Sequence, residues 1–141
     1  MKVYILGSTK FVDDMVRVID ELKALGVDAW IHPDYIEYVK HPEHAHLKQI
    51  EAGEQWKVKK ANDYIRQHYN GILESDAVLF VNLKKGEIEN YIGGNALMEM
   101  GMAYVNGKKI YLLNNIPEIQ YKDEIVAMQP ICLEGDLNNL Q

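Results

Sequence analysis

The stretch ESDAVLFVNLKKGEIENYIGGNALMEMGMAYVNGKKIYLL, residues 74–113, decides the fold. It begins with a continuous apolar run at 77–82, which is typical of a strand buried on both faces. After a polar segment, paired glycines open a helix predicted over 93–105, and an Asn-Gly pair ends it. A second apolar run at 109–113 predicts another strand. Strand, helix and strand in this order indicate two parallel strands joined by a right-handed crossover.

The same alternation continues toward the N-terminus. An apolar run predicts a strand at 2–6, and apolar residues spaced by three and four predict an amphipathic helix over 11–25. A second short strand is expected at 28–32. Residues 33–49 contain two prolines and three histidines without a sustained period, so we expect a surface loop with room for a helical turn. Apolar positions between 50 and 73 predict a long helix that covers one face of the sheet.

Toward the C-terminus, the pattern predicts a short helix at 121–128 and an extended piece at 130–133. Strands that alternate with helices indicate an α/β fold, and we predict a doubly wound, mainly parallel sheet of about five strands, Rossmann-like or flavodoxin-like. The length of 141 residues predicts one domain over residues 1–141. In such sheets, ligands bind beyond the carboxyl ends of the strands, so we expect a small-molecule site there.

The composition bears on the partners and the cellular compartment of the protein. The chain has 21 acidic and 15 basic residues, a formal charge of −6, which argues against polymeric nucleic acid or an anionic membrane surface as a partner. Cys132 is the single cysteine, so no intramolecular disulfide forms and a reducing compartment is expected. The first residues run directly into a strand without a signal-peptide pattern. We therefore expect a cytoplasmic protein.

The glycine pair before the helix at 93–105 is the most informative candidate site. Glycines let backbone amides approach a ligand, and a helix N-terminus favours anionic or oxygen-rich groups. Glu99 falls in the first turns of this helix, on or beside the face expected to pack on the sheet. Burying a carboxylate there without a partner costs about several kcal/mol of folding free energy, because its charge loses the surrounding water. Glu99 therefore either has a chemical function or stabilises the helix N-terminus.

Three other groups of residues are less decisive. Gly7-Ser8-Thr9-Lys10 follows the first strand and either cradles a phosphate or provides a helix cap and a solvated lysine. The histidines lack a zinc-type framework, so we expect neither a metal nor a cofactor. Tyr64, His68 and Tyr69 read as packing residues, with His68 reaching the site only if its helix end points there.

The chain resembles the nucleoside 2-deoxyribosyltransferases and their relatives, the 2-deoxynucleoside 5′-monophosphate N-glycosidases, over nearly its whole length. Residues 74–113 carry the strongest part of the resemblance: a buried strand, a loop, a glycine-rich helix start with a glutamate, and the following GK strand. The opening YILGSTKF resembles the family's first strand and its sugar or phosphate loop. The Gly-x-x-x-x-Glu-x-Gly pattern runs from Gly94 through Glu99 to Gly101.

The resemblance implies cleavage or exchange of the N-glycosidic bond of a nucleoside or nucleotide. Glu99 would be the nucleophile that attacks the anomeric carbon and forms a glycosyl-enzyme, which another base or water resolves. Ser8 and Lys10 fall where the monophosphate-specific relatives keep phosphate contacts, which favours a nucleotide substrate. The expected substrate-binding residues are Gly7, Ser8, Lys10, Phe11, Asn82, Gly93, Gly94 and Asn95.

The chain departs from the family pattern at two positions. His68 stands where the family has an aspartate on the long helix, and Gly93 stands where it has an aspartate or serine. His68 either protonates the leaving base, since imidazole titrates near neutral pH, or marks a changed substrate or lost catalysis. The competing function is a non-catalytic nucleotide-binding or sensing module. Family members assemble as oligomers with shared sites, so the resemblance also implies a homodimer or larger.

Overall fold

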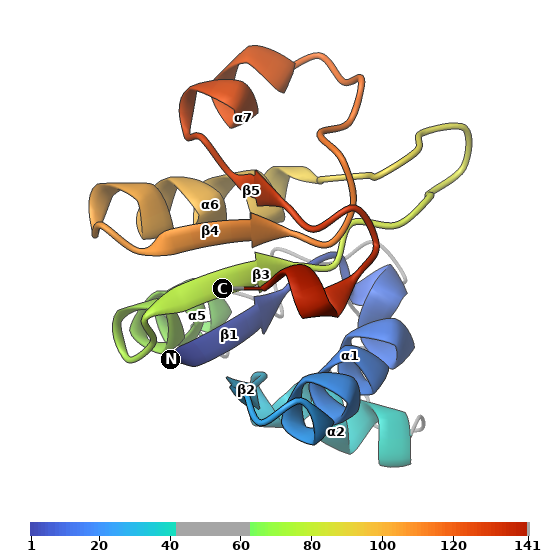
Figure 1. Ribbon diagram of the computed structural model, residues 1–141, viewed down its shortest axis with the longest axis vertical. Helices are drawn as coiled ribbons and strands as arrows, with labels where there is room; N and C mark the ends of the chain where they lie inside the picture. Colours follow the sequence, from blue (N-terminus) through green and yellow to red (C-terminus); the bar gives the residue numbers. More distant parts are fainter. Residues whose placement is uncertain (42–62, 141) are drawn as a thin grey trace.

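The computed structural model describes residues 1–41 and 63–140. Their strands form one five-stranded sheet in the order β2-β1-β3-β4-β5, and every neighbouring pair is parallel. Figure 1 shows the strands side by side with helices packed around them. The predicted α/β fold with a doubly wound parallel sheet is therefore confirmed. The strands are β1 (Lys2–Leu6), β2 (Asp28–Trp30), β3 (Ala77–Phe80), β4 (Lys109–Leu112) and β5 (Ile131–Cys132).

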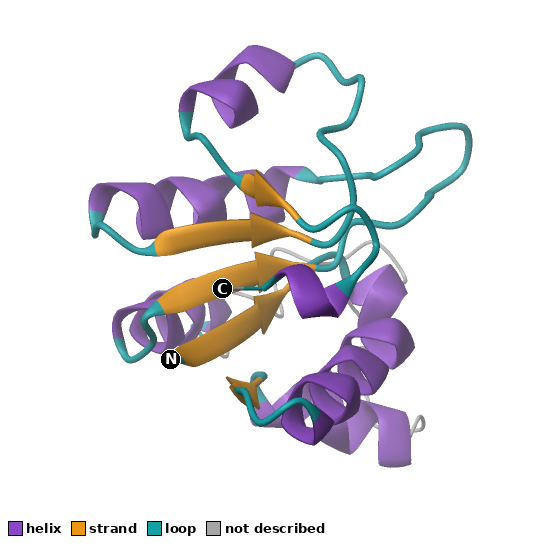
Figure 2. Ribbon diagram, viewed as in Figure 1, coloured by secondary structure: helices purple, strands orange, loops and turns teal. Residues whose placement is uncertain are grey.

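Helices cover both faces of this sheet (Figure 2). On one face, Val3 and Ile5 of β1 pack in a core with Met15 of the first helix. On the other face, Tyr4 and Leu6 pack with Met100 of the helix after β3. The helices are α1 (Val12–Ala24), α2 (Pro33–Lys40), α5 (Tyr64–Leu73), α6 (Gly94–Val105) and α7 (Lys122–Ala127), with short 3-10 turns at Thr9–Phe11 and Leu137–Asn139.

The prediction of a surface loop from residue 33 is wrong for its first part, because Pro33–Lys40 forms helix α2. Pro33 starts the helix, where its missing N–H costs nothing and its fixed φ suits the first turn. The side chain of His32 accepts a hydrogen bond from the Asp34 amide at 3.1 Å and caps the helix. Asp34 also places a negative charge in the first turn, where the helix dipole favours it.

The long helix predicted over 50–73 is seen in part. Helix α5 is its described portion, and the predicted residues 50–62 lie outside the described residues, as does the part of the 33–49 prediction beyond residue 41. Along the described part of the chain, no helix combines the length and apolar character needed to cross a bilayer.

Candidate active site

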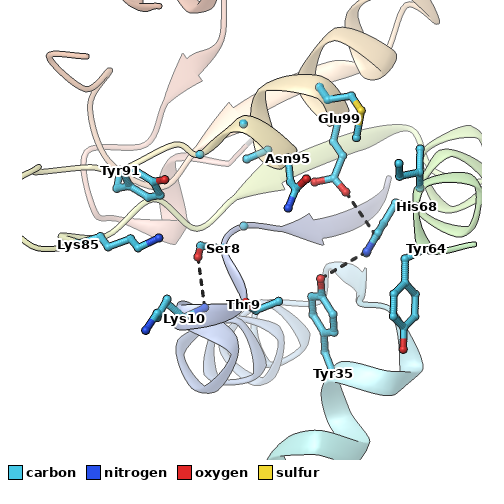
Figure 3. Close-up of a pocket in the computed structure, with 16 residues that line it drawn as sticks. Ser8, Thr9, Lys10, Tyr35, Tyr64, His68, Lys85, Tyr91, Asn95 and Glu99 are labelled. Atoms are coloured by element: carbon cyan, nitrogen blue, oxygen red, sulfur yellow. Dashed lines mark hydrogen bonds and ion pairs between the residues drawn. The ribbon is translucent and has the colours of Figure 1, made fainter. Parts of the chain in front are cut away.

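A cavity of about 370 Å³ lies at the carboxyl ends of β1 and β3. Connections from these adjacent central strands lead to opposite faces of the sheet, and this reversal is where ligands bind in open parallel α/β sheets. The first strand's loop, the start of α6, helix α2 and helix α5 all contribute to its walls (Figure 3). Its lining consists of Gly7, Ser8, Thr9, Lys10, Tyr35, Tyr64, Ile65, His68, Lys85, Tyr91, Gly93, Gly94, Asn95, Ala96, Met98 and Glu99.

Most of the residues expected to form the site line this one cavity. They come from three separate parts of the chain: the loop after β1, helix α5 and the first turns of α6. Gly7 adopts a φ of +155°, and a Cβ at this position would lie 3.1 Å from the Val81 carbonyl oxygen. The loop after β1 therefore turns closely past the end of β3, and glycine suits that turn. The expected residues found in the lining are Gly7, Ser8, Lys10, His68, Gly93, Gly94, Asn95 and Glu99.

Two expected substrate-binding residues do not line the cavity. Phe11 is buried in the core beside helix α1. Asn82 is also buried, and its side-chain amide donates to the Asn115 carbonyl at 3.0 Å while its oxygen accepts from the Asn114 amide at 2.9 Å. Asn82 thus joins the loops after β3 and β4. Its side chain supports the edge of the sheet without facing the cavity.

Glu99 is buried within α6, with 6% of its surface exposed. Ala96, Met100 and Ala103 of the same helix are buried as well, so the carboxylate lies at the margin of the packed face. It points into the cavity, where its Oε2 lies 3.7 Å from His68 Nδ1 (Figure 3). Glu99 is the sixth residue of α6, beyond the first turn in which the helix dipole is strongest. The cavity and His68 therefore account for its placement better than helix-end stabilisation does.

His68 faces the cavity from α5 and contacts two tyrosine hydroxyls. Tyr4 Oη lies 2.8 Å from its Nδ1, and Tyr35 Oη lies 3.4 Å from its Nε2. Burial raises the pKa of both tyrosines, and the nearby charge of Glu99 raises it further. Both hydroxyls therefore keep their protons at neutral pH. We expected His68 to be a packing residue. Its ring is buried, but it also forms polar contacts with Tyr4, Tyr35 and the candidate nucleophile Glu99.

Aromatic side chains build the wall beside His68. Tyr64 donates a hydrogen bond to Asp34 Oδ2 at 2.6 Å, which ties α5 to the start of α2. The ring of His32 meets Tyr64 edge-on at a centroid distance of 5.4 Å, and His32 Nε2 is hydrogen-bonded to Gln67 Oε1. Sequence reasoning did not assign Tyr35 to the site, because it lies in the segment interpreted as a loop. Its apolar spacing within residues 33–40 is the signal that was available.

Positive charge gathers at the other end of the cavity. Lys10 and Lys85 both line it, and neither forms an ion pair within the part of the chain that the structure describes. Lys85 Nζ lies 4.6 Å from the centre of the Tyr91 ring. That ring packs against Gly93, where a Cβ would come within 3.0 Å of the tyrosine oxygen. The absence of a side chain at Gly93 thus makes room for Tyr91.

Comparisons of the chain with protein-family models, curated proteins and solved structures find no match. Within residues 1–41 and 63–140, no cluster of three or more histidine, cysteine, aspartate or glutamate side chains could hold a metal ion. His44 and His46 lie outside these residues.

Proposed function

We propose that this protein is an enzyme that cleaves or exchanges the N-glycosidic bond of a (deoxy)nucleoside or nucleoside 5′-monophosphate, with Glu99 as the nucleophile. The observation that carries the proposal is the buried Glu99 carboxylate in a cavity that glycines line on one side. A carboxylate suits this task because it can form an ester with an oxocarbenium-like carbon and later leave it. The resemblance of residues 74–113 to the deoxyribosyltransferase family supports the same assignment.

The two ends of the cavity differ in a way that suits a nucleotide. Glu99 and His68 occupy one end with Tyr35 and Tyr64, which offer flat surfaces for a base. Ser8, Lys10 and Lys85 lie toward the other end, near the N-terminus of α6. Hydroxyls, ammonium groups and free helix amides are groups that bind phosphate. This polarity supports a 5′-monophosphate substrate over an uncharged nucleoside.

A second candidate is a non-catalytic nucleotide-binding or sensing module with the same pocket. The contact between His68 and Glu99 favours it, because a buried carboxylate facing an imidazolium is stabilised without any reaction. In that case the pocket would bind a nucleotide and leave it intact.

We further propose that the chain works in the cytoplasm as a homodimer or larger assembly. Helices α5 and α6 lie next to each other and expose apolar side chains. Ile65 and Met98 belong to this exposed surface and also line the cavity, so a second copy packed there would extend the cavity wall. The exposed apolar or aromatic residues on the two helices are Ile65, Leu73, Met98, Tyr104 and Val105.

The proposed function is tested by measuring base release from a panel of ribo- and deoxyribonucleosides and their 5′-monophosphates. We expect the wild type to release a base and Glu99→Gln to lose at least about 1,000-fold in rate, as expected for removal of a nucleophile. Calorimetric titration of the same compounds shows whether the variant still binds. Equal base release by both proteins would contradict the role of Glu99. Binding without base release by the wild type would favour the sensing module.

Addition of a free acceptor base separates the two enzymatic outcomes. A new nucleoside in the products indicates transfer, because the acceptor base has resolved the glycosyl-enzyme. Free sugar or sugar phosphate alone indicates hydrolysis.

A further inference from the structure

The hydroxyl of Tyr35 lies beside His68 in the wall of the cavity. Tyr35 lies in the first turn of α2, its side chain is 7% exposed, and it belongs to the cavity lining. Its Oη is 3.4 Å from His68 Nε2. The other tyrosine bonded to His68, Tyr4, contacts Nδ1 and is not part of the lining. Of these two hydroxyls, that of Tyr35 is the one that a ligand in the cavity can reach.

We propose that Tyr35 is a catalytic residue whose hydroxyl gives its proton to the departing base and takes a replacement from His68 Nε2. This inference rests on the proposed function, because it requires a base to leave a sugar in this cavity. It differs from direct protonation by His68, which is one of the alternatives that the resemblance left open for that residue. A base that took the proton directly from Nε2 would have to displace the Tyr35 hydroxyl from its hydrogen bond.

The surroundings of Tyr35 explain why its proton transfer must be coupled to His68. Burial and the charge of Glu99 raise the pKa of Tyr35, so a free tyrosinate is costly in this position. Tyr35 can therefore give up a proton only while it receives one. The His68 ring nitrogen on the other side of the hydroxyl is placed to supply it. The Glu99 carboxylate, 3.7 Å from Nδ1, favours the positively charged imidazole by Coulomb attraction.

In the first half of the proposed reaction, Glu99 attacks C1′ and the base departs with a proton. The proposed step starts from a Glu99 carboxylate and a His68 imidazolium, a state in which Nδ1–H donates to Tyr4 and Nε2–H donates to Tyr35. A Glu99 oxygen forms a bond to C1′ while the C1′–N bond breaks, and its electron pair stays with the base. The base takes the Tyr35 hydroxyl proton, and the Tyr35 oxygen takes the Nε2 proton. The products are a neutral base, a glycosyl ester on Glu99 and a neutral His68.

The second half of the reaction returns Glu99, Tyr35 and His68 to their starting protonation states. A water oxygen attacks C1′, and the ester C–O bond breaks and returns its electron pair to Glu99. The water gives a proton to the Tyr35 oxygen as Tyr35 gives its own proton to His68 Nε2. The enzyme regains its carboxylate and imidazolium, and the sum is substrate plus water to base plus sugar. An acceptor base that carries an N–H proton replaces water in the transferase version.

The fold holds Tyr35 in place for this role. Its ring centre lies 5.7 Å from that of His68 and 6.0 Å from that of His32, the residue that caps α2. The hydroxyl is therefore fixed by a packed ring at the start of a helix, and little reorganisation is needed when the base departs.

The test compares Tyr35→Phe with wild type on substrates whose bases need a proton to different degrees. The first pair is 2′-deoxyguanosine and its N7-methyl derivative, whose positively charged base leaves as a neutral molecule without protonation. The second pair is 2′-deoxyuridine and 5-nitro-2′-deoxyuridine, whose base is the better leaving group. Each is assayed with and without a 5′-phosphate. We expect about a 100-fold loss in kcat/KM on the unmodified substrates and less than about a threefold loss on the activated ones.

Tyr104→Phe is the matched control, because Tyr104 near the end of α6 does not line the cavity and the variant keeps the aromatic ring that its exposed surface presents. It should leave every rate unchanged. An equal loss by Tyr35→Phe on activated and unmodified substrates would show a structural role, and no loss would show that Tyr35 is not needed; either result overturns the inference. A wild type that releases no base from any substrate would instead overturn the proposed function, and this inference with it.

Discussion

Single side chains at this site are explained by contacts that lie far apart in the sequence. Desolvation of the Glu99 carboxylate costs free energy, which the neighbouring imidazole of His68 offsets. The glycines before α6 left two interpretations of Glu99 open, a site residue or a stabiliser of the helix N-terminus, and the structure shows its side chain in the lining of the cavity. The resemblance also placed His68 in the candidate site, but spacing did not predict its contact with Glu99, because the two side chains meet only through the packing of α5 against α6. Tyr35 was missed because it lies in the segment interpreted as a loop, and its contact with His68 joins two separate helices, α2 and α5.

The adjacent lysines Lys84 and Lys85 should differ in how much they contribute to substrate binding. Lys84 pairs with Glu89 at 3.4 Å, whereas Lys85 lines the cavity against Tyr91. We expect Lys85→Ala to raise the KM for a nucleoside 5′-monophosphate about tenfold, the effect of losing one charged hydrogen bond. Lys84→Ala should change it less than about twofold, because an exposed ion pair contributes little. Steady-state kinetics on the monophosphate and on the matching nucleoside measure both effects. A similar rise with the uncharged nucleoside would show that Lys85 does not bind phosphate.

At the scale of elements, periodicity predicted the parts of the fold that have a buried stripe. The apolar run of β3 and the spacing in α1 and α6 identified those elements, and their ends were correct to within a few residues. Helix α2 was missed because prolines were interpreted as breakers of structure. Pro33 instead occupies the helix start, where proline is favourable, and the cap comes from His32.

The exposed apolar sides of α5 and α6 are the surface through which we expect two copies to assemble. Val105 is 78% exposed in line with Met98 on α6, and Leu73 continues an apolar stripe on α5. If a second copy packs there, Val105→Glu buries an unpaired charge at the interface. We expect the wild type to sediment as a dimer or larger species and Val105→Glu to dissociate at concentrations at least about tenfold higher.

Val126→Glu is the control for this experiment, since Val126 is 47% exposed on α7, a different helix. Its assembly should match that of the wild type in analytical ultracentrifugation. A wild type that stays monomeric, or a control that dissociates as readily as Val105→Glu, would contradict an interface on α5 and α6.

At the scale of the whole molecule, the topology of the sheet brings the site together. The strand order places β1 beside β3, so the loop after β1 meets the start of α6 across the sheet edge. The sequence was sufficient to predict this meeting, because parallel strands share one carboxyl edge. It was not sufficient to assign Asn82 correctly, because a polar residue at this edge either faces the ligand or joins neighbouring loops. In this fold Asn82 joins the loops after β3 and β4.

Because of the buried tyrosines, the free energy of unfolding of the whole molecule should change with pH in the alkaline range. Tyr4 and Tyr35 have pKa values raised by burial and by Glu99, so in the folded state both stay protonated above pH 10. In the unfolded chain they ionise near pH 10, and the folded state then binds more protons. The free energy of unfolding should therefore hold steady below about pH 9 and fall above about pH 10, by about 1.4 kcal/mol per pH unit for each buried tyrosine.

Urea unfolding of wild type, Tyr35→Phe and Tyr104→Phe between about pH 8 and pH 11 measures this dependence. Tyr35→Phe removes one of the titrating groups, so its decline above pH 10 should be shallower than that of the wild type by up to about 1.4 kcal/mol per pH unit. Because Tyr104 is 51% exposed, the Tyr104→Phe variant should follow the wild-type slope. Parallel slopes for wild type and Tyr35→Phe would mean that the Tyr35 hydroxyl ionises in the folded protein as it does in water. The hydroxyl would then lack the buried environment on which its coupling to His68 depends.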